Sequence, residues 1–130
     1  MNFQKQQTKF LKTSNTQKLK NHEKNGNKLF FYVIGVISLA FLSKIFYFQI
    51  INGEVGISDL IPNHFHGWAG LLGLGLMIYL RHLGLRARKN RLEKKPFAKI
   101  SNLHGRLSDI MIYLIMIHAF LGFLYLFTYL

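Results

Sequence analysis

Three long apolar stretches constrain the fold of this 130-residue chain more than any other feature. They cover about residues 29–51, 65–83 and 107–129. A helix needs about 20 apolar residues to cross a hydrocarbon core of about 30 Å. In lipid, backbone polar groups are satisfied only inside helices or closed barrels. The sequence therefore predicts an all-α integral membrane protein with three transmembrane helices, all within one domain of residues 28–130.

Residues 1–27 have a different composition. They are rich in Gln, Asn and Thr and contain six lysines, with few apolar side chains between them. A segment of this kind buries too little apolar surface to offset its loss of conformational entropy. We therefore expect a disordered basic tail before the first transmembrane helix.

The distribution of charge predicts the orientation in the membrane. Residues 81–106 carry nine Lys or Arg and one Glu, whereas the loop at 52–63 carries only Glu54 and Asp59. Basic loops stay on the cytoplasmic side. The N-terminus is thus predicted to be cytoplasmic, or stromal in a photosynthetic membrane. This pattern explains most of the formal charge of +12, so the expected partner is the lipid bilayer and not nucleic acid.

Several classes of chemistry have no support in the sequence. The chain has no cysteine, which excludes disulfides, thiolate metal sites and cysteine nucleophiles. It also lacks a P-loop, a nucleophile elbow and an HExxH motif. We assign no catalytic residue, and the sequence does not decide whether the protein is an enzyme.

Two histidines in the third apolar stretch are the main functional candidates. His104 and His118 are fourteen residues apart, which on a helix turns them to within about 40° of each other and separates them by about 21 Å. An ionisable residue inside a membrane span is by default a functional hypothesis. One interpretation is that both imidazoles bind a cofactor such as haem. The other is that His104 caps the helix at the interface and His118 bonds a neighbouring helix.

The depths of the histidines predict two cofactor-binding pairs. His66 and His118 lie toward the outer side of the membrane, and they are the preferred axial metal ligands of one haem b. His82 and His104 lie toward the inner side and form a second candidate pair. Because His66 and His82 are sixteen residues apart, they point about 160° apart on one helix. Chlorophyll, or no cofactor, is the alternative.

Small residues accompany the outer histidines. Gly70 follows His66, and Ala119 and Gly122 follow His118, at helical spacing. Small side chains allow close approach of another helix or of a flat macrocycle. Both interpretations remain open from the sequence.

Two sequence patterns resemble known proteins. The segments 103–105 and 118–122 resemble the paired-histidine helix of b-type membrane cytochromes. The wider pattern of Asn52-Gly53, Pro62, His66, Gly70-Leu71 and Asn102-Leu103-His104 resembles an uncharacterised family of small multi-helix membrane proteins from cyanobacteria and plastid-bearing lineages, over about residues 22–126.

The second resemblance implies a location and an assembly. The membrane would be a thylakoid or plasma membrane. Longer members of the family carry an additional N-terminal span that has no counterpart in this sequence. A complete four-helix cofactor cage would therefore need a homodimer or a larger membrane complex.

These observations lead to two hypotheses about function. The first is a small b-type-cytochrome-like carrier of single electrons with a bis-histidine haem. The second is a non-catalytic accessory or assembly subunit of a photosynthetic or respiratory membrane complex.

Overall fold

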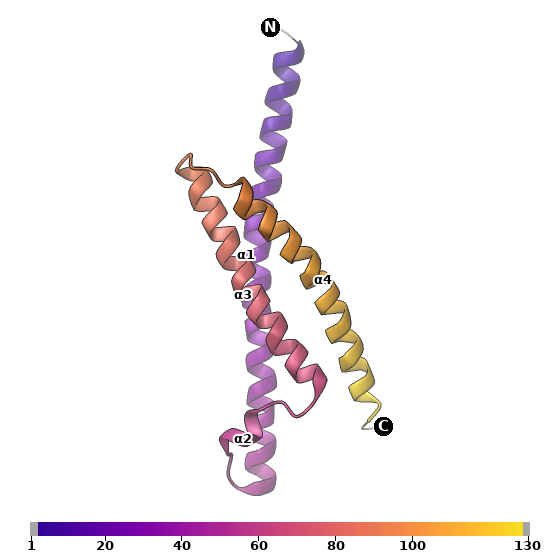
Figure 1. Cartoon of the computed structure of the whole chain (residues 1–130). Coiled ribbons are helices and arrows are strands. Elements are labelled where there is room, and N and C mark those ends of the chain that lie inside the picture. Colours follow the sequence, from indigo (N-terminus) through magenta and orange to yellow (C-terminus); the bar gives the residue numbers. More distant parts are fainter. Residues whose placement is uncertain (1–2, 129–130) are drawn as a thin grey trace. The chain divides into compact units, whose positions relative to one another are not determined.

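The computed structural model describes residues 3–128, with side chains from Thr13 onward. Its elements are the helices α1 (Phe3–Asn52), α2 (Ile57–Leu60), α3 (Phe65–Leu92) and α4 (Ala98–Leu126), and these residues form no strand (Figure 1). The all-α fold class is therefore confirmed. The chain divides after Gly35 into two units, which are described separately below.

Three of the four helices are long and apolar enough to cross a membrane. They are α1 from Thr13, α3 and α4, so the prediction of three candidate transmembrane helices is confirmed. The helices are longer than the predicted spans, because α3 continues to Leu92 and α4 already begins at Ala98. Arg, Lys, Leu and Ala are good helix formers, so these helices do not end where their apolar stretches end.

The predicted disordered tail is not confirmed. In the first unit the helix α1 already begins at Phe3 and continues through the basic segment. Lys, Gln and Leu favour helix, and no proline interrupts the sequence before Pro62. Once a helix is nucleated, each further residue adds a hydrogen bond at little cost. The apolar part of α1 therefore provides a helix that the polar residues before it extend.

The second unit begins within α1 and contains the loop of residues 53–64, which is called the outer loop after its predicted side of the membrane. Gly53 ends α1 with a positive φ of 74°, a conformation that glycine adopts at no steric cost. The side-chain amide of Gln49 donates a hydrogen bond to the carbonyl of Gly53 at 2.8 Å. Further along the loop, the carbonyl of Ile61 accepts a hydrogen bond from Nζ of Lys44 at 3.2 Å. The charged end of Lys44 thus has a polar partner in the outer loop.

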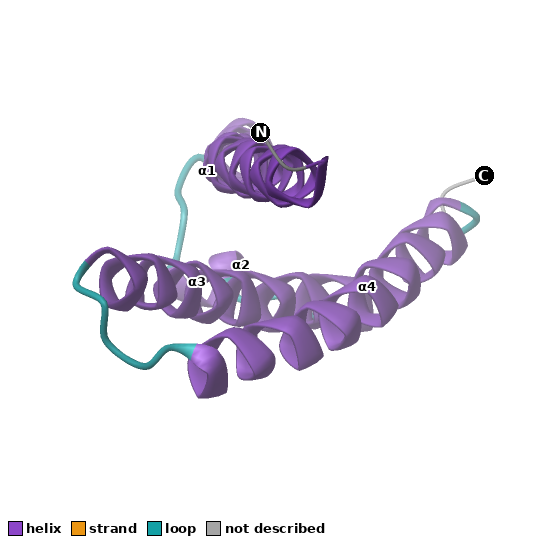
Figure 2. Ribbon diagram, turned by 90° about the horizontal axis from the view of Figure 1, so that it is seen from above, coloured by secondary structure: helices purple, strands orange, loops and turns teal. Residues whose placement is uncertain are grey.

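Helices α3 and α4 pack side by side as an antiparallel hairpin (Figures 1 and 2). The most buried side chains of the described residues all belong to this hairpin, and they are Ala69, Leu80, Leu83 and Met111. On α4 the residues that face α3 recur at every seventh position. This spacing is typical of helices that pack nearly parallel or antiparallel over a long distance. Histidines occupy two of these repeating positions, on either side of Met111.

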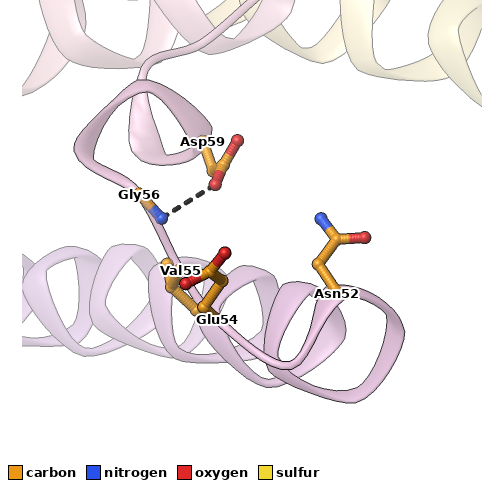
Figure 3. Close-up of a pocket in the computed structure, with 5 residues that line it drawn as sticks. All are labelled: Asn52, Glu54, Val55, Gly56 and Asp59. Atoms are coloured by element: carbon orange, nitrogen blue, oxygen red, sulfur yellow. Dashed lines mark hydrogen bonds between the residues drawn. The ribbon is translucent and has the colours of Figure 1, made fainter.

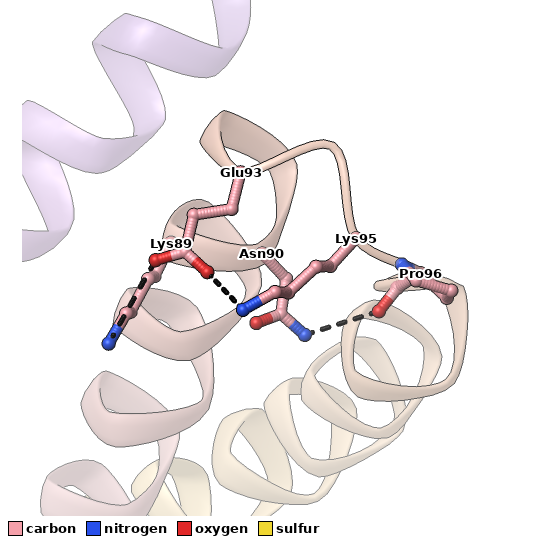
Figure 4. Close-up of polar contacts among 5 residues, drawn as sticks. All are labelled: Lys89, Asn90, Glu93, Lys95 and Pro96. Carbon is pink, nitrogen blue, oxygen red and sulfur yellow. Dashed lines mark hydrogen bonds and ion pairs between the residues drawn. The ribbon is translucent and has the colours of Figure 1, made fainter.

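The loop between α3 and α4 is short and closed by polar contacts (Figure 4). Glu93 forms ion pairs with Lys95 at 2.6 Å and with Lys89 at 4.0 Å. The amide of Asn90 donates to the carbonyl of Pro96 at 3.1 Å. Pro96 lies between the two helices, because α3 ends before it and α4 begins after it.

Candidate cofactor site

The half of the α3–α4 hairpin next to the 53–64 loop, called its outer half, contains two contacting histidines from different helices, and the half next to the α3–α4 loop is called its inner half. Nδ1 of His66 on α3 donates a hydrogen bond to the backbone carbonyl of His118 on α4 at 3.1 Å. The two imidazole rings also stack, with centroids 4.1 Å apart and planes inclined by 19°. The sequence predicts that these two residues lie at similar depth, and in the structure they are in contact.

Each of these imidazoles lies against a glycine of the opposite helix. A Cβ added to Gly122 of α4 would lie 2.8 Å from Cε1 of His66, and one added to Gly70 of α3 would lie 3.1 Å from Cε1 of His118. Both distances are shorter than an ordinary van der Waals contact, so any other residue would displace the ring. Glycine at these two positions therefore gives each imidazole its place between the helices.

The inner half of the hairpin also has a histidine that bonds across the two helices, but here the ring belongs to α4. Nδ1 of His104 on α4 donates to the carbonyl of Leu80 on α3 at 3.1 Å. The ring lies over Gly84, where an added Cβ would be 3.5 Å from Cε1 of His104. The hydroxyl of Ser108 donates to the carbonyl of His104 at 2.8 Å. His104 is thus bonded across the helix pair by its own ring nitrogen.

The contacts of the two α4 histidines follow one antiparallel register. His104 meets Gly84 and His118 meets Gly70. The two histidines are fourteen residues apart on α4, and the two glycines are fourteen residues apart on α3. Fourteen residues are close to four helical turns, so both pairs lie on the same side of the hairpin at two depths. The prediction that His104 and His118 share a helix face is therefore confirmed.

The hydrogen bonds also fix the position of ring protons. A carbonyl oxygen only accepts hydrogen bonds, so Nδ1 of His66 and of His104 carries a proton, and in a neutral ring of this tautomer Nε2 has a free lone pair. Histidines that bind metals commonly have this arrangement, with Nδ1–H bonded to a backbone carbonyl. Nδ1 of His118 is buried and has no hydrogen-bond partner among the described residues.

The structure does not arrange the two predicted pairs as opposed ligands. The metal-binding lone pair of an imidazole lies in the plane of its ring. Because the rings of His66 and His118 stack on each other, they do not direct these lone pairs at one iron from opposite sides, and a macrocycle does not fit between them. His82 is exposed on α3, whereas the ring of His104 lies over Gly84. Among the described residues, no group of three or more His, Asp or Glu could hold a metal ion.

His64 precedes the first residue of α3, and the sequence did not predict its role there. It is the N-cap residue, and its Nδ1 accepts a hydrogen bond from the backbone N–H of Gly67 at 3.0 Å. Burial, followed by the nearby positive charges of His66 and Lys44, lowers the pKa of His64 below its ordinary value of 6.5. A neutral ring keeps the lone pair that the cap requires. The pattern of apolar residues contains no signal for this role.

Tyr125 and Gly67 complete the outer end. The ring of Tyr125 lies 4.3 Å from that of His64, and it continues the seven-residue repeat of α4. That repeat could have identified Tyr125 from the sequence. An added Cβ at Gly67 would lie only 2.6 Å from Cβ of Pro62, so the first turn of α3 requires glycine there.

A separate shallow hollow lies in the outer loop, lined by Asn52, Glu54, Val55, Gly56 and Asp59 (Figure 3). One carboxylate oxygen of Asp59 accepts the backbone N–H of Gly56 at 2.9 Å. This contact stabilises the loop turn. The candidate site is therefore formed by the histidines of α3 and α4 and not by this hollow.

Comparisons of this chain with protein-family models, with curated proteins and with solved structures found no match. The function is therefore argued from the site alone.

Proposed function

We propose that this protein carries single electrons within a membrane and holds b-type haem through His104 and His118 of α4. One observation carries the proposal. Histidines fourteen residues apart on one helix meet glycines fourteen residues apart on the neighbouring helix. In four-helix bundles, cofactor sites are commonly formed in the core by side chains on facing helices.

The two imidazoles of this proposal lie in the contact between α3 and α4. The ring of His118 lies against Gly70, and the ring of His104 lies over Gly84. The bond from His104 to the carbonyl of Leu80 leaves Nε2 available as a ligand. Haem in such a site would supply reversible one-electron chemistry, with a potential that depends on its ligands and on the apolar surroundings.

His66 has a positioning role in this proposal. Its hydrogen bond and its stacked ring hold the backbone and the side chain of His118. This assignment differs from a direct ligand role for His66, because the stacked geometry does not suit a pair of opposed ligands. His82 has no role in the proposed site.

The proposal includes an orientation. The basic α3–α4 loop and the N-terminus lie on the cytoplasmic or stromal side, as the excess of Lys and Arg favours. His104 is then the inner ligand and His118 the outer one. The resemblance to small proteins of cyanobacteria and plastid-bearing lineages supports a thylakoid or plasma membrane, and both locations remain predictions.

The test is the absorbance of the full-length protein, purified in detergent after expression with haem supplied. We expect a low-spin b-type spectrum that changes sharply on reduction with dithionite. His104→Ala and His118→Ala should each remove part of this spectrum, whereas His82→Ala should leave it unchanged. Equal spectra in all three variants would contradict the assignment.

An accessory or assembly subunit is the second candidate function. It is favoured by the apolar segment of α1, none of which is buried among the described residues. A partner subunit could cover this surface as well as lipid does. Native electrophoresis of the source membrane tests this candidate, because an accessory subunit migrates only with a large complex and a free small oligomer would contradict it.

A further inference from the structure

The inner end of the hairpin carries a strong excess of positive charge. Residues 81–106 contain nine Lys or Arg and a single carboxylate, Glu93. That carboxylate already forms ion pairs with Lys89 and Lys95 (Figure 4). Among the residues that the structure describes, no ion pair involves the exposed side chains of Arg86 and Arg106. An anion from outside the described chain could therefore bind these two guanidinium groups.

The helix register places Arg86 and Arg106 at similar depth. His104 of α4 lies over Gly84 of α3, so in this antiparallel pair Arg106 is level with His82. Arg86 lies four residues further along α3, which is about 6 Å along the helix axis. The headgroup layer of a bilayer is about 5–7 Å thick on each side of the hydrocarbon core. Both arginines therefore fit within one headgroup layer.

Apolar side chains beside the two arginines favour the membrane interface at this depth. Tyr79 is 47% exposed and lies about one turn deeper in the hairpin than Arg106, and tyrosine is enriched where membrane and water meet. Leu85 and Leu103 are also exposed, and the register makes them level with each other, beside Arg86 and Arg106. A lipid has apolar chains beneath its phosphate and suits this mixture, whereas free phosphate or nucleic acid would leave both leucines in water.

The outer end of the hairpin has no comparable charge. Helix α3 carries no Lys or Arg before Arg81, and α4 carries none after Arg106. The outer loop contains the carboxylates of Glu54 and Asp59. An anionic headgroup is therefore attracted to the inner end of the hairpin and not to the outer end.

We propose that the inner end of the hairpin binds anionic phospholipids of the adjacent leaflet, and that Arg86 and Arg106 each bind a headgroup phosphate. A guanidinium group donates two parallel hydrogen bonds to a phosphate. Clusters of Lys and Arg next to a transmembrane helix attract anionic lipids, whereas a zwitterionic headgroup brings a cation of its own into the excess of positive charge. The binding does not depend on a haem group.

The single tryptophan of the chain allows a test at both ends of the hairpin. Trp68 lies in the first turn of α3 at the outer end, and the variant Trp68→Phe/Tyr79→Trp moves the fluorophore to the inner end. The full-length protein is placed in bilayers of phosphatidylcholine and phosphatidylglycerol with matched acyl chains, one of them brominated. Quenching by the brominated lipid gives the relative affinity of the two lipids beside the tryptophan. The inner tryptophan should report a preference for phosphatidylglycerol of about fivefold for each arginine that binds a headgroup, and Trp68 should report none.

Charge variants of the inner-tryptophan protein test the two arginines. Arg86→Gln/Arg106→Gln should lose most of the preference. Lys94→Gln/Lys99→Gln removes the same charge farther from the hydrocarbon core and should keep it. Arg86→Lys/Arg106→Lys should keep part of it, because an ammonium group retains the charge but not the paired donors. Circular dichroism checks that each variant keeps its helices.

Three results would overturn the proposal. The first is equal affinity of the inner tryptophan site for the two lipids, and the second is an equal loss of preference in both glutamine variants. The third concerns free phosphate as the ligand. Inorganic phosphate should lower the preference no more than chloride does at equal ionic strength, and a larger effect would assign the arginines to free phosphate.

Discussion

The two ends of the α3–α4 hairpin share one helix register but differ in how their histidines are held. At the inner end His104 bonds across to the carbonyl of Leu80 with its own ring. At the outer end His118 makes no such bond through Nδ1, and His66 of α3 supplies both the cross-helix hydrogen bond and a stacked ring. One ligand candidate is thus held by its own contacts, and the other depends on a neighbour.

The two ends also differ in the space beside their glycines. A Cβ added at Gly122 or Gly70 would lie 2.8 Å or 3.1 Å from the nearest ring atom, whereas one added at Gly84 would lie at an ordinary 3.5 Å. The outer end should therefore tolerate substitution less well than the inner end. The following predictions are arranged from the largest expected effect to the smallest.

Gly122→Ala should destabilise the hairpin most. Its methyl group would displace the ring of His66, and overpacking of this kind costs about 1–3 kcal/mol. Unfolding by SDS in mixed micelles, followed by circular dichroism, measures the change. Gly84→Ala at the inner end is the matched variant, and Gly75→Ala, which meets nothing within 4 Å, controls for helix propensity. If Gly122→Ala and Gly84→Ala have equal effects, the two ends do not differ as described.

Replacement of His66 should separate its hydrogen bond from its stacking. His66→Phe keeps an aromatic ring but loses the bond to the carbonyl of His118, at a cost of about 1 kcal/mol. His66→Ala loses both contacts and should be less stable than His66→Phe. In the haem-loaded protein both variants should perturb the outer site and leave the spectrum of the inner site unchanged. A complete loss of the b-type spectrum in both variants would show that His66 does more than position His118.

The N-cap of α3 should make stability depend on pH. Because the folded-state pKa of His64 is lowered below 6.5, the unfolded chain binds more protons on acidification. The stabilisation is therefore complete above about pH 6.5 and is lost as the pH falls through the folded-state pKa. The cap contributes about 1 kcal/mol. His64→Asn keeps an acceptor that does not titrate, so its unfolding free energy should not show this dependence, and an unchanged pH profile would contradict the cap.

Lys94 should give the smallest effect, and the opposite sign. It follows α3 with a φ of 54°, and the backbone N–H groups of Lys94 and Lys95 donate to the carbonyls of Arg91 and Asn90. These bonds form a helix C-terminal motif that favours glycine at the left-handed position. Lys94→Gly should raise the unfolding free energy by about 1 kcal/mol. A loss of stability would mean that the Lys94 side chain contributes more than its backbone strain costs.

The sequence was sufficient to predict the elements that depend on length and periodicity. The three apolar helices follow from the length of their apolar stretches. The common face of His104 and His118 follows from their fourteen-residue spacing, and the contact between His66 and His118 follows from their depths.

Other features depend on contacts that no single segment contains. The stacking of His66 on His118 depends on the register of two helices, which sets Gly122 opposite His66. The depths placed these two rings together but gave no information on the angle between their planes. The basic segment of α1 is polar in composition, but its Lys, Gln and Leu residues favour helix and it continues directly into the apolar part of the same helix.

The most direct test of the central claim is a dithionite-reduced minus oxidised absorbance spectrum of the purified full-length protein, together with its haem content. The claim predicts a sharp α-band typical of low-spin b-type haem, and haem that copurifies with the protein. A spectrum without this band, from protein that is folded and was made with haem available, would contradict it. The histidines of α3 and α4 would then serve only to hold the hairpin together.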